Sequence, residues 1–167
     1  MIKIFNSLLV TMFGLGKIKL MPGTFGSFAT IILLFYLFHS LNISSNIILI
    51  ALIIIFIYSF YAVSTHTESS KNKDPGEIII DEFLGQSIPI YLYEISHGTT
   101  KESDQAIVYY ALFFILFRYF DIMKPFPVNF FDKNFKNSFG VIMDDICAGL
   151  YVVLTVVCFM FIKSYVL

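Results

Sequence analysis

Two pairs of adjacent acidic residues each stand directly before an apolar stretch of the sequence: Asp81-Glu82 and Asp144-Asp145. A charge at the edge of an apolar segment is costly to desolvate unless another group compensates it. One such group is Mg²⁺, a hard cation that prefers carboxylate oxygens. Another is a helix N-terminus, whose free N–H groups and dipole favour acids. Neighbouring residues point about 100° apart on a helix, so one cap cannot use both side chains of a pair. The pairs therefore favour a metal site, with helix capping as the alternative.

Residues 14–27 supply a second chemical feature, a segment with four glycines and a proline that predicts a loop. Thr24 and Ser27 are residue types that cap helices, and we expect them to cap the apolar helix that follows. A glycine-rich loop that leads into a helix offers N–H groups to an anion, and Lys17 and Lys19 lie nearby. A plain helix cap with a basic membrane flank is the alternative.

The composition is that of an integral membrane protein. The chain of 167 residues is 57% hydrophobic and only 14% charged, whereas soluble domains carry roughly 25% charged residues. The length fits a single domain over residues 1–167. Cys147 and Cys158 lie about 16 Å apart along one expected helix, so they cannot form a disulfide with each other.

The apolar stretches that must position these groups predict an all-α fold, a compact membrane-associated bundle of about six helices, several of them transmembrane or partly embedded. Residues 1–13 are expected at the membrane interface or against the bundle. Pro89 is expected to kink its helix, and Asp74-Pro75-Gly76 and residues 119–127 are expected to form a turn and a loop. The expected helices cover residues 28–39, 47–63, 78–95, 105–117, 128–139 and 145–161.

The distribution of basic residues predicts the topology. If each apolar stretch from residue 28 onward crosses the membrane, residues 14–27, 64–82 and 118–145 share one face. That face holds Lys17, Lys19, Lys71, Lys73, Arg118, Lys124, Lys133 and Lys136, against Lys101 and Lys163 on the other. Short loops rich in Lys and Arg stay in the cytoplasm. The same alternation gathers the acids on that face: Asp74, Asp81, Glu82, Asp121, Asp144 and Asp145.

Carboxylates, cations and a glycine-rich loop on one cytoplasmic face are typical of metal-assisted chemistry on a phosphate. Four blocks of the sequence, at residues 22–27, 81–86, 117–127 and 140–149, resemble in the same order those of the bacterial phosphatidylglycerophosphatase A family. The resemblance implies a Mg²⁺-dependent phosphatase that converts phosphatidylglycerophosphate to phosphatidylglycerol at the inner membrane. It also implies a central helix surrounded by others, with a phospholipid and the bilayer as partners and no nucleic acid.

Roles for individual residues follow from the resemblance together with their chemistry. We expect metal ligation by Asp81, Glu82, Asp144 and Asp145, catalytic roles for Asp121 and Asp145, and substrate binding by Arg118, Lys124, Thr24, Gly26 and Ser27. Asp121 is a ligand or a general base, unless it only forms an ion pair with Arg118 or Lys124. The alternatives for the two cations are membrane-edge positions, and for the acids helix caps or surface sites. Asp74 is a weaker candidate because Asp-Pro-Gly is also a plain turn.

Two other functions are alternatives to this one. A phosphatidyl-group transferase also uses clustered Asp and Mg²⁺, but the Asp-Gly…Ala-Arg…Gly…Asp…Asp pattern of the alcohol phosphatidyltransferases is missing. A small metal-binding membrane protein or a transporter component without enzymatic activity is the alternative function. A conduction path would need ionisable residues inside the spans, and the apolar stretches are almost free of charge apart from Glu94 near an end.

Overall fold

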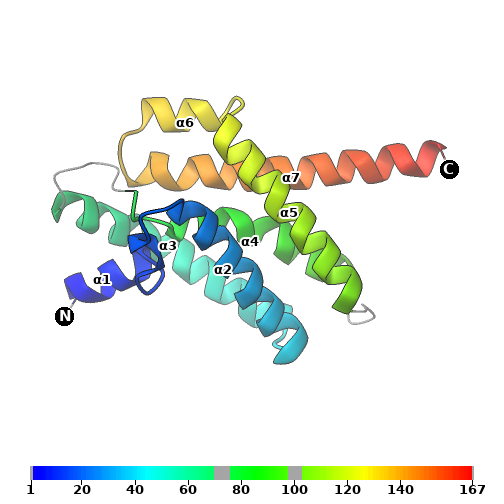
Figure 1. The fold of residues 1–167 in the computed structure, drawn as a ribbon, viewed down its shortest axis with the longest axis horizontal. Helices are drawn as coiled ribbons and strands as arrows, with labels where there is room; N and C mark the ends of the chain where they lie inside the picture. Colours follow the sequence, from blue (N-terminus) through cyan, green and yellow to red (C-terminus); the bar gives the residue numbers. More distant parts are fainter. Residues whose placement is uncertain (1, 70–75, 98–102, 167) are drawn as a thin grey trace.

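The computed structural model describes residues 2–69, 76–97 and 103–166, and among these residues it contains helices and no strand, as Figure 1 shows. The all-α prediction is therefore confirmed. Asp74, Lys71, Lys73 and Lys101 lie outside the described residues. The elements in chain order are α1 (Ile2–Val10), the 3-10 helix η1 (Leu15–Lys17), α2 (Pro22–Phe35), the π-helical turn η2 (Tyr36–Ser40), α3 (Ser45–Ser69), α4 (Ile80–His97), α5 (Ser103–Met123), α6 (Val128–Asn134) and α7 (Ser138–Val166).

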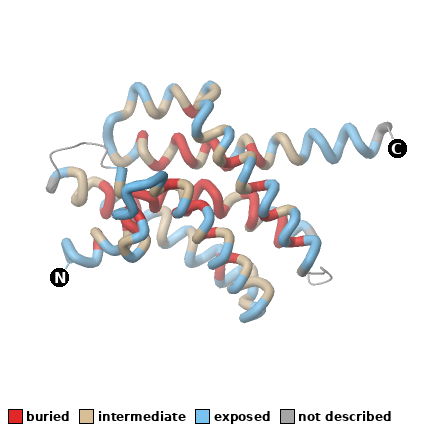
Figure 2. The backbone as a smooth tube through the Cα atoms, viewed as in Figure 1, coloured by how far each residue is buried: buried red, intermediate tan, exposed pale blue. Residues whose placement is uncertain are grey.

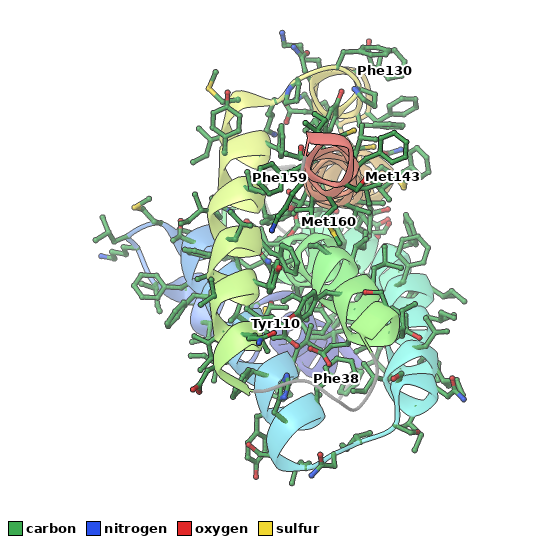
Figure 3. The ribbon with its side chains drawn as sticks, turned by 90° about the vertical axis from the view of Figure 1, so that its right-hand side faces the viewer. Phe38, Tyr110, Phe130, Met143, Phe159 and Met160 are labelled. Atoms are coloured by element: carbon green, nitrogen blue, oxygen red, sulfur yellow. The ribbon has the colours of Figure 1, made fainter. Side chains whose placement is uncertain are left out.

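Four of these helices are long and apolar enough to cross a membrane. They cover Pro22–Ser40, Ser45–Glu68, Asp104–Met123 and Ser138–Ser164. Much of their surface is exposed and apolar, most visibly on the end of α7 that projects beyond the other helices (Figure 2). Viewed from that end, Phe159 and Met160 stand out from the helix (Figure 3). Apolar side chains on every side of a helix are typical of contact with lipid.

Helix α4 is the central element and packs against α2, α3, α5 and α7. It is buried along most of its length, yet it carries the polar residues Asp81, Glu82, Gln86 and Glu94. These residues make it less apolar than the four helices around it. At the end away from the acid pair, Glu94 accepts a hydrogen bond of 2.9 Å from the Tyr110 hydroxyl. The polar groups of α4 are therefore enclosed by protein rather than by lipid.

Two glycines allow α4 to pack closely against α7. A Cβ atom at Gly85 would collide with the backbone of Asp145 and the ring of Phe117, and one at Gly149 would collide with the carbonyl oxygen of Gly85. Pro89 lies inside α4 and has no N–H, so the Gly85 carbonyl four residues earlier cannot accept the usual helical hydrogen bond from residue 89. The two helices thus make backbone contact at Asp145 and again one turn beyond it, at Gly149.

Two predicted helix boundaries near the acids are wrong. Helix α5 continues through the segment expected to be a loop and ends at Met123, where Lys124 adopts a left-handed conformation with φ 44° before Pro125. Helix α7 begins at Ser138 rather than at Asp145. The Asn137 side chain accepts a 3.1 Å hydrogen bond from the Gly140 N–H at this new start. The cap interpretation of Asp144-Asp145 is therefore wrong, because both acids lie in the second turn of the helix.

The glycine-rich segment also differs from the prediction. Helix α2 begins at Pro22, a favoured residue for a first helical position, and Met21 is its N-cap. Thr24 and Ser27 therefore lie inside the helix, and the prediction that they cap it is wrong. Helix α6 is likewise shorter than the amphipathic stretch predicted over residues 128–139, since it ends at Asn134.

Candidate active site

A cavity of about 410 Å³ opens at the end of the bundle where α2, α4 and α7 begin and α5 ends. Residues from five helices line it, so the segments predicted to share one face do come together. Its lining combines acids with cations: Asp81, Glu82, Asp121, Asp132, Asp144, Asp145, Arg118, Lys124 and Lys136. Such a lining fits an anionic ligand together with a cation better than it fits an apolar molecule.

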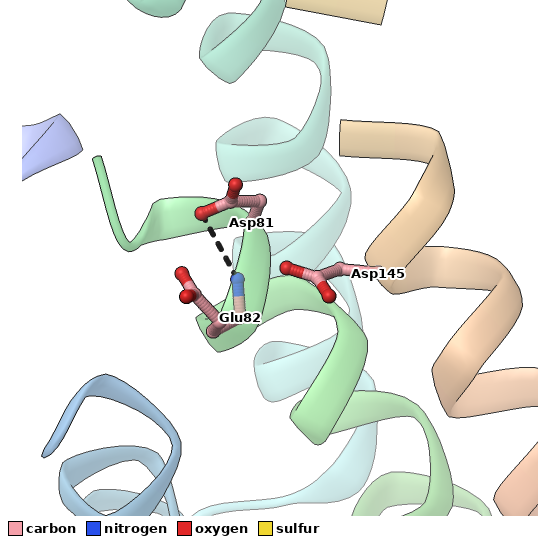
Figure 4. Close-up of side chains that lie close together, drawn as sticks. All are labelled: Asp81, Glu82 and Asp145. Carbon is pink, nitrogen blue, oxygen red and sulfur yellow. Dashed lines mark hydrogen bonds between the residues drawn. The ribbon is translucent and has the colours of Figure 1, made fainter. Parts of the chain in front are cut away.

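Three carboxylates at the inner wall of the cavity form what we call the acid triad: Asp81, Glu82 and Asp145. Each offers an oxygen that lies within 4.8 Å of the others. The first turn of α4 supplies Asp81 and Glu82, and α7 directs Asp145 toward them (Figure 4). The backbone N–H of Glu82 donates a 3.1 Å hydrogen bond to Asp81 Oδ1. Oxygens of this kind at this spacing can share one divalent cation.

The acid triad is electrostatically unfavourable by itself. Burial raises the pKa of the Asp81 carboxyl well above its ordinary value of 3.8, and the nearby charges of Glu82 and Asp145 raise that pKa further. Burial also raises the pKa of Glu82. The buried atoms Glu82 Oε2 and Asp145 Oδ1 have no hydrogen-bond partner among the described residues. Crowded, desolvated and unpartnered carboxylates are the arrangement that a bound cation relieves.

The other acid of the α7 pair, Asp144, has a different partner. Lys124 Nζ lies 3.0 Å from Asp144 Oδ2 and 2.8 Å from Asp132 Oδ1. Burial alone would lower the pKa of the Lys124 ammonium, but the bonds and charges of Asp132 and Asp144 outweigh burial and raise it. Asp144 therefore stands next to the triad as a partner of Lys124, and Asp132 is a site residue that sequence reasoning missed.

Arg118 and Asp121 form a second pair on α5. Arg118 Nη1 lies 2.8 Å from Asp121 Oδ2, the ion pair that their three-residue spacing allows, and 3.5 Å from the Ser27 hydroxyl oxygen. Asp121 also lies close enough to Asp145 and Glu82 to interact with both carboxyls. The buried Arg118 Nε has no partner among the described residues. The guanidinium thus keeps a donor beside the acids.

The first turns of α2 form the remaining wall. Thr24 lines the cavity, and Gly23 lies so close to Glu82 that a Cβ atom there would overlap its carboxylate. Gly26 packs against the side chain of Ile79 instead of lining the cavity. Of the predicted substrate-binding residues on α2, Thr24 reaches the cavity directly and Ser27 reaches it through Arg118.

A buried amide one helical turn beyond Glu82 was also missed. Gln86 is fully buried on α4, and neither its Oε1 nor its Nε2 has a partner among the described residues. Residues four apart share a helix face, so this spacing from Glu82 was the available signal. Leaving buried amide atoms unpaired is costly, and Gln86 therefore continues the polar character of the site toward the core.

Comparison with known proteins addresses the function of this site. A family model described as Phosphatidylglycerophosphatase A matches residues 8–160. The chain belongs to the phosphatidylglycerophosphatase A family. The match spans all four blocks that carried the resemblance, and the predicted membership and enzyme class are confirmed. No solved structure matches the chain.

Three relatives of the chain differ in the headgroup that their names specify. Phosphatidylglycerophosphatase A of Haemophilus influenzae is 36% identical over 89% of this chain and 85% of its own. The Escherichia coli protein of the same name is 28% identical over 86% of this chain and 76% of its own. A Bacteroides thetaiotaomicron protein with the provisional name phosphatidylinositol-3-phosphatase is 32% identical over 86% of both chains.

Proposed function

We propose that this family member hydrolyses phosphatidylglycerophosphate to phosphatidylglycerol and phosphate, with Mg²⁺ as cofactor, at the cytoplasmic face of the bacterial inner membrane. The observation that carries the proposal is the acid triad beside Arg118, in a cavity at one end of a bundle with four described helices long and apolar enough to cross a membrane. A lipid phosphomonoester has its charged group at the membrane surface and its acyl chains in the bilayer, which suits a site at a helix end.

The residues present fit a magnesium ion. Asp81, Glu82 and Asp145 would hold it, since all three are carboxylates and two of them have an unpartnered buried oxygen. When bound, Mg²⁺ neutralises phosphoryl oxygens and lowers the pKa of a coordinated water. Asp144 lies next to Asp145 in the sequence and supports the three ligands through its contact with Lys124.

The remaining groups bind the phosphate and handle the proton. Arg118 lines the cavity and presents its guanidinium to a phosphoryl oxygen, while Asp121 Oδ2 orients that group. The other oxygen of Asp121, Oδ1, accepts the proton of the attacking water as general base. Lys124 adds positive charge, and Thr24 offers a hydroxyl at the α2 wall.

Phosphate release from pure phosphatidylglycerophosphate by the purified protein tests the proposal. We expect activity that excess chelator abolishes and that Mg²⁺ restores. Full activity in excess chelator would instead favour a metal-free route with an aspartate as covalent nucleophile. An inactive protein that still binds Mg²⁺ at the triad would point to the non-enzymatic alternative, a metal-binding membrane protein.

A second headgroup belongs in the same assay because of the relative named for phosphatidylinositol 3-phosphate. Both lipids present a phosphomonoester to the same acids and Arg118, so they differ in the shape of the attached alcohol. We expect phosphatidylglycerophosphate to have the higher kcat/KM. A preference for the inositol lipid would change the substrate assignment and leave the catalytic assignment standing.

A further inference from the structure

The segment between α1 and α2 forms an apolar projection at the end of the molecule that holds the site. We call residues 12–21 the lip. Its side chains are mostly exposed, with 86% of Phe13 and 71% of Leu20 accessible, and most of it is pale blue in Figure 2. The lip continues into the cavity wall, because Met21 and Pro22 line the cavity. An exposed apolar segment of this kind needs a partner surface.

The backbone of residues 12–18, the first part of the lip, is arranged for an apolar environment. Every N–H group from residue 12 to residue 18 donates to a carbonyl oxygen of residues 8–15, with donor–acceptor distances from 2.7 to 3.3 Å. Exposed loops in water do not need this, because water satisfies their amides. Within the hydrocarbon region of a bilayer an unpaired amide is costly, so a loop that reaches that region must satisfy its own backbone.

Backbone strain in the lip also indicates that its conformation serves a purpose. Met12, Phe13 and Met21 have φ angles of 44°, 59° and 51°, a left-handed conformation that L-residues other than Asn and Asp rarely adopt. Such strain persists only where the surrounding structure imposes it. Gly16 supplies part of this support, because it packs directly against the backbone of Glu77, where a Cβ atom would not fit. Of these strained residues, Phe13 and Met21 are exposed apolar side chains, whereas Met12 is half-buried against the core.

Two cations accompany these apolar residues. Lys17 and Lys19 lie in the lip and are exposed, and the described lip residues include no acid to neutralise them. Apolar side chains flanked by lysines are the combination that binds the interface of a membrane containing anionic lipids. Charge complementarity therefore favours an anionic lipid surface over a second, equally basic copy of the lip.

We propose that the lip inserts Phe13 and Leu20 at the boundary between headgroups and acyl chains and gathers anionic phospholipid beside the cavity through Lys17 and Lys19. The insertion depends only on the lip. The gathering role rests on the proposed function, since it supplies the lipid phosphomonoester to the acids.

A single tryptophan can report the depth of the lip, because the chain contains none. We expect Phe13→Trp in vesicles to be quenched most by phosphatidylcholine brominated at shallow acyl positions and little by aqueous iodide. Adding phosphatidylglycerol should strengthen the shallow quenching, and Lys17→Gln with Lys19→Gln should remove that increase. Leu41→Trp, exposed between η2 and α3, is the matched control and should not respond to phosphatidylglycerol.

Three results would overturn the insertion. They are strong iodide quenching of residue 13, blue-shifted emission without quenching by brominated lipid (a protein contact instead), and equal responses at residues 13 and 41. None of these depends on hydrolysis, so they are separate from a failure of the proposed function.

The gathering role has its own readout. In mixed micelles we expect the double lysine variant to raise the surface KM about tenfold, with kcat and the Mg²⁺ requirement unchanged. A short-chain, monomeric substrate should show no such change. An unchanged surface KM, or an equal loss with the short-chain substrate, would refute lipid gathering even if the lip inserts.

Discussion

At the scale of single residues, helix geometry separates the two adjacent acids of α7. Asp145 points at α4 and joins Asp81 and Glu82, whereas Asp144 pairs with Lys124. A sequence shows that two acids are adjacent, but it does not show how the helix is rotated about its axis. The acid cluster was therefore predictable from the sequence, and the division of labour within it was not.

The first prediction concerns Asp145→Asn. The change keeps the size of the side chain and removes a charge from the triad, so we expect a normally folded protein with weaker Mg²⁺ binding. Activity should fall by at least about 100-fold, because even outer partners of metal ligands cost 10–100-fold. Phosphate release across a Mg²⁺ titration measures both effects. Asp104→Asn, an exposed acid in the first turn of α5, should behave as wild type; equal loss in both variants would contradict the assignment.

The second prediction separates phosphate binding from metal binding. Arg118→Lys keeps the charge and loses the planar fork that contacts Asp121 and Ser27. We expect turnover to fall about 10–100-fold while the Mg²⁺ concentration for half-maximal activity stays the same. A parallel shift in that Mg²⁺ concentration would mean that Arg118 acts through the triad rather than on the substrate.

The third prediction concerns pH and follows from the raised pKa of Asp81 and Glu82. The folded protein without metal holds protons on these acids more tightly than the unfolded chain does. Its stability should therefore fall as pH rises from about 4 through the folded pKa values. Mg²⁺ binds the ionised acids, so its stabilising effect should grow over the same range. Thermal unfolding with chelator and with Mg²⁺ at several pH values checks this; a metal-free protein that gains stability with pH would contradict it.

At the scale of elements, the apolar stretches located the helices but not their ends. Hydropathy marks where a helix leaves lipid, whereas a helix continues as long as its backbone bonds and caps allow. Helix α5 therefore runs on through Arg118 and Asp121, and α7 begins before Asp144. The polar helix ends that hydropathy assigned to loops are the parts that carry the site. Asn137 is a residue type that caps helices, so the sequence contained a signal for the start of α7. The hydrophobic pattern indicated a later start.

The fourth prediction concerns the glycine contact between α4 and α7. A methyl group at Gly149 would strike the Gly85 carbonyl oxygen, so Gly149→Ala should push apart the two helices that carry the triad. We expect a loss of about 1–3 kcal/mol in unfolding free energy and a large loss of Mg²⁺ affinity. Gly76→Ala, which meets open space, is the control for stability. Equal stability of the two variants would show that the contact is looser than described.

At the scale of the whole molecule, the sequence predicted that distant segments share one face, and the cavity brings those segments together. The prediction held because successive apolar helices alternate in direction, so connectivity alone sorts their ends. Enclosure of α4 could not be predicted in this way. The family resemblance implied a central helix surrounded by others, and the packing of α2, α3, α5 and α7 around α4 explains how its polar residues are kept from lipid.

The fifth prediction concerns orientation. Described basic residues at the site end include Lys17, Lys19, Arg118, Lys124, Lys133 and Lys136. In a variant without Cys147 and Cys158, we expect Lys136→Cys to react with an impermeant maleimide only from the cytoplasm, and Leu41→Cys only from the periplasm. Reversed labelling would place the site outside. Labelling of both positions from one side would contradict the topology, in which α3, α4 and α5 cross the membrane between residues 41 and 136.

The length of helix α7 relates the depth of the site to the thickness of the membrane. From Asp145 to Ser164 it rises about 28 Å, close to the ~30 Å thickness of a bilayer's hydrocarbon layer. If the apolar part of α7 fills that layer, Asp145 stands at the level of the lipid phosphates. A lipid could then be dephosphorylated without lifting its acyl chains out of the leaflet, and both substrate and product could travel sideways. Lengthening or shortening α7 by one turn would mismatch the acids and the phosphate in height while leaving every residue of the site in place.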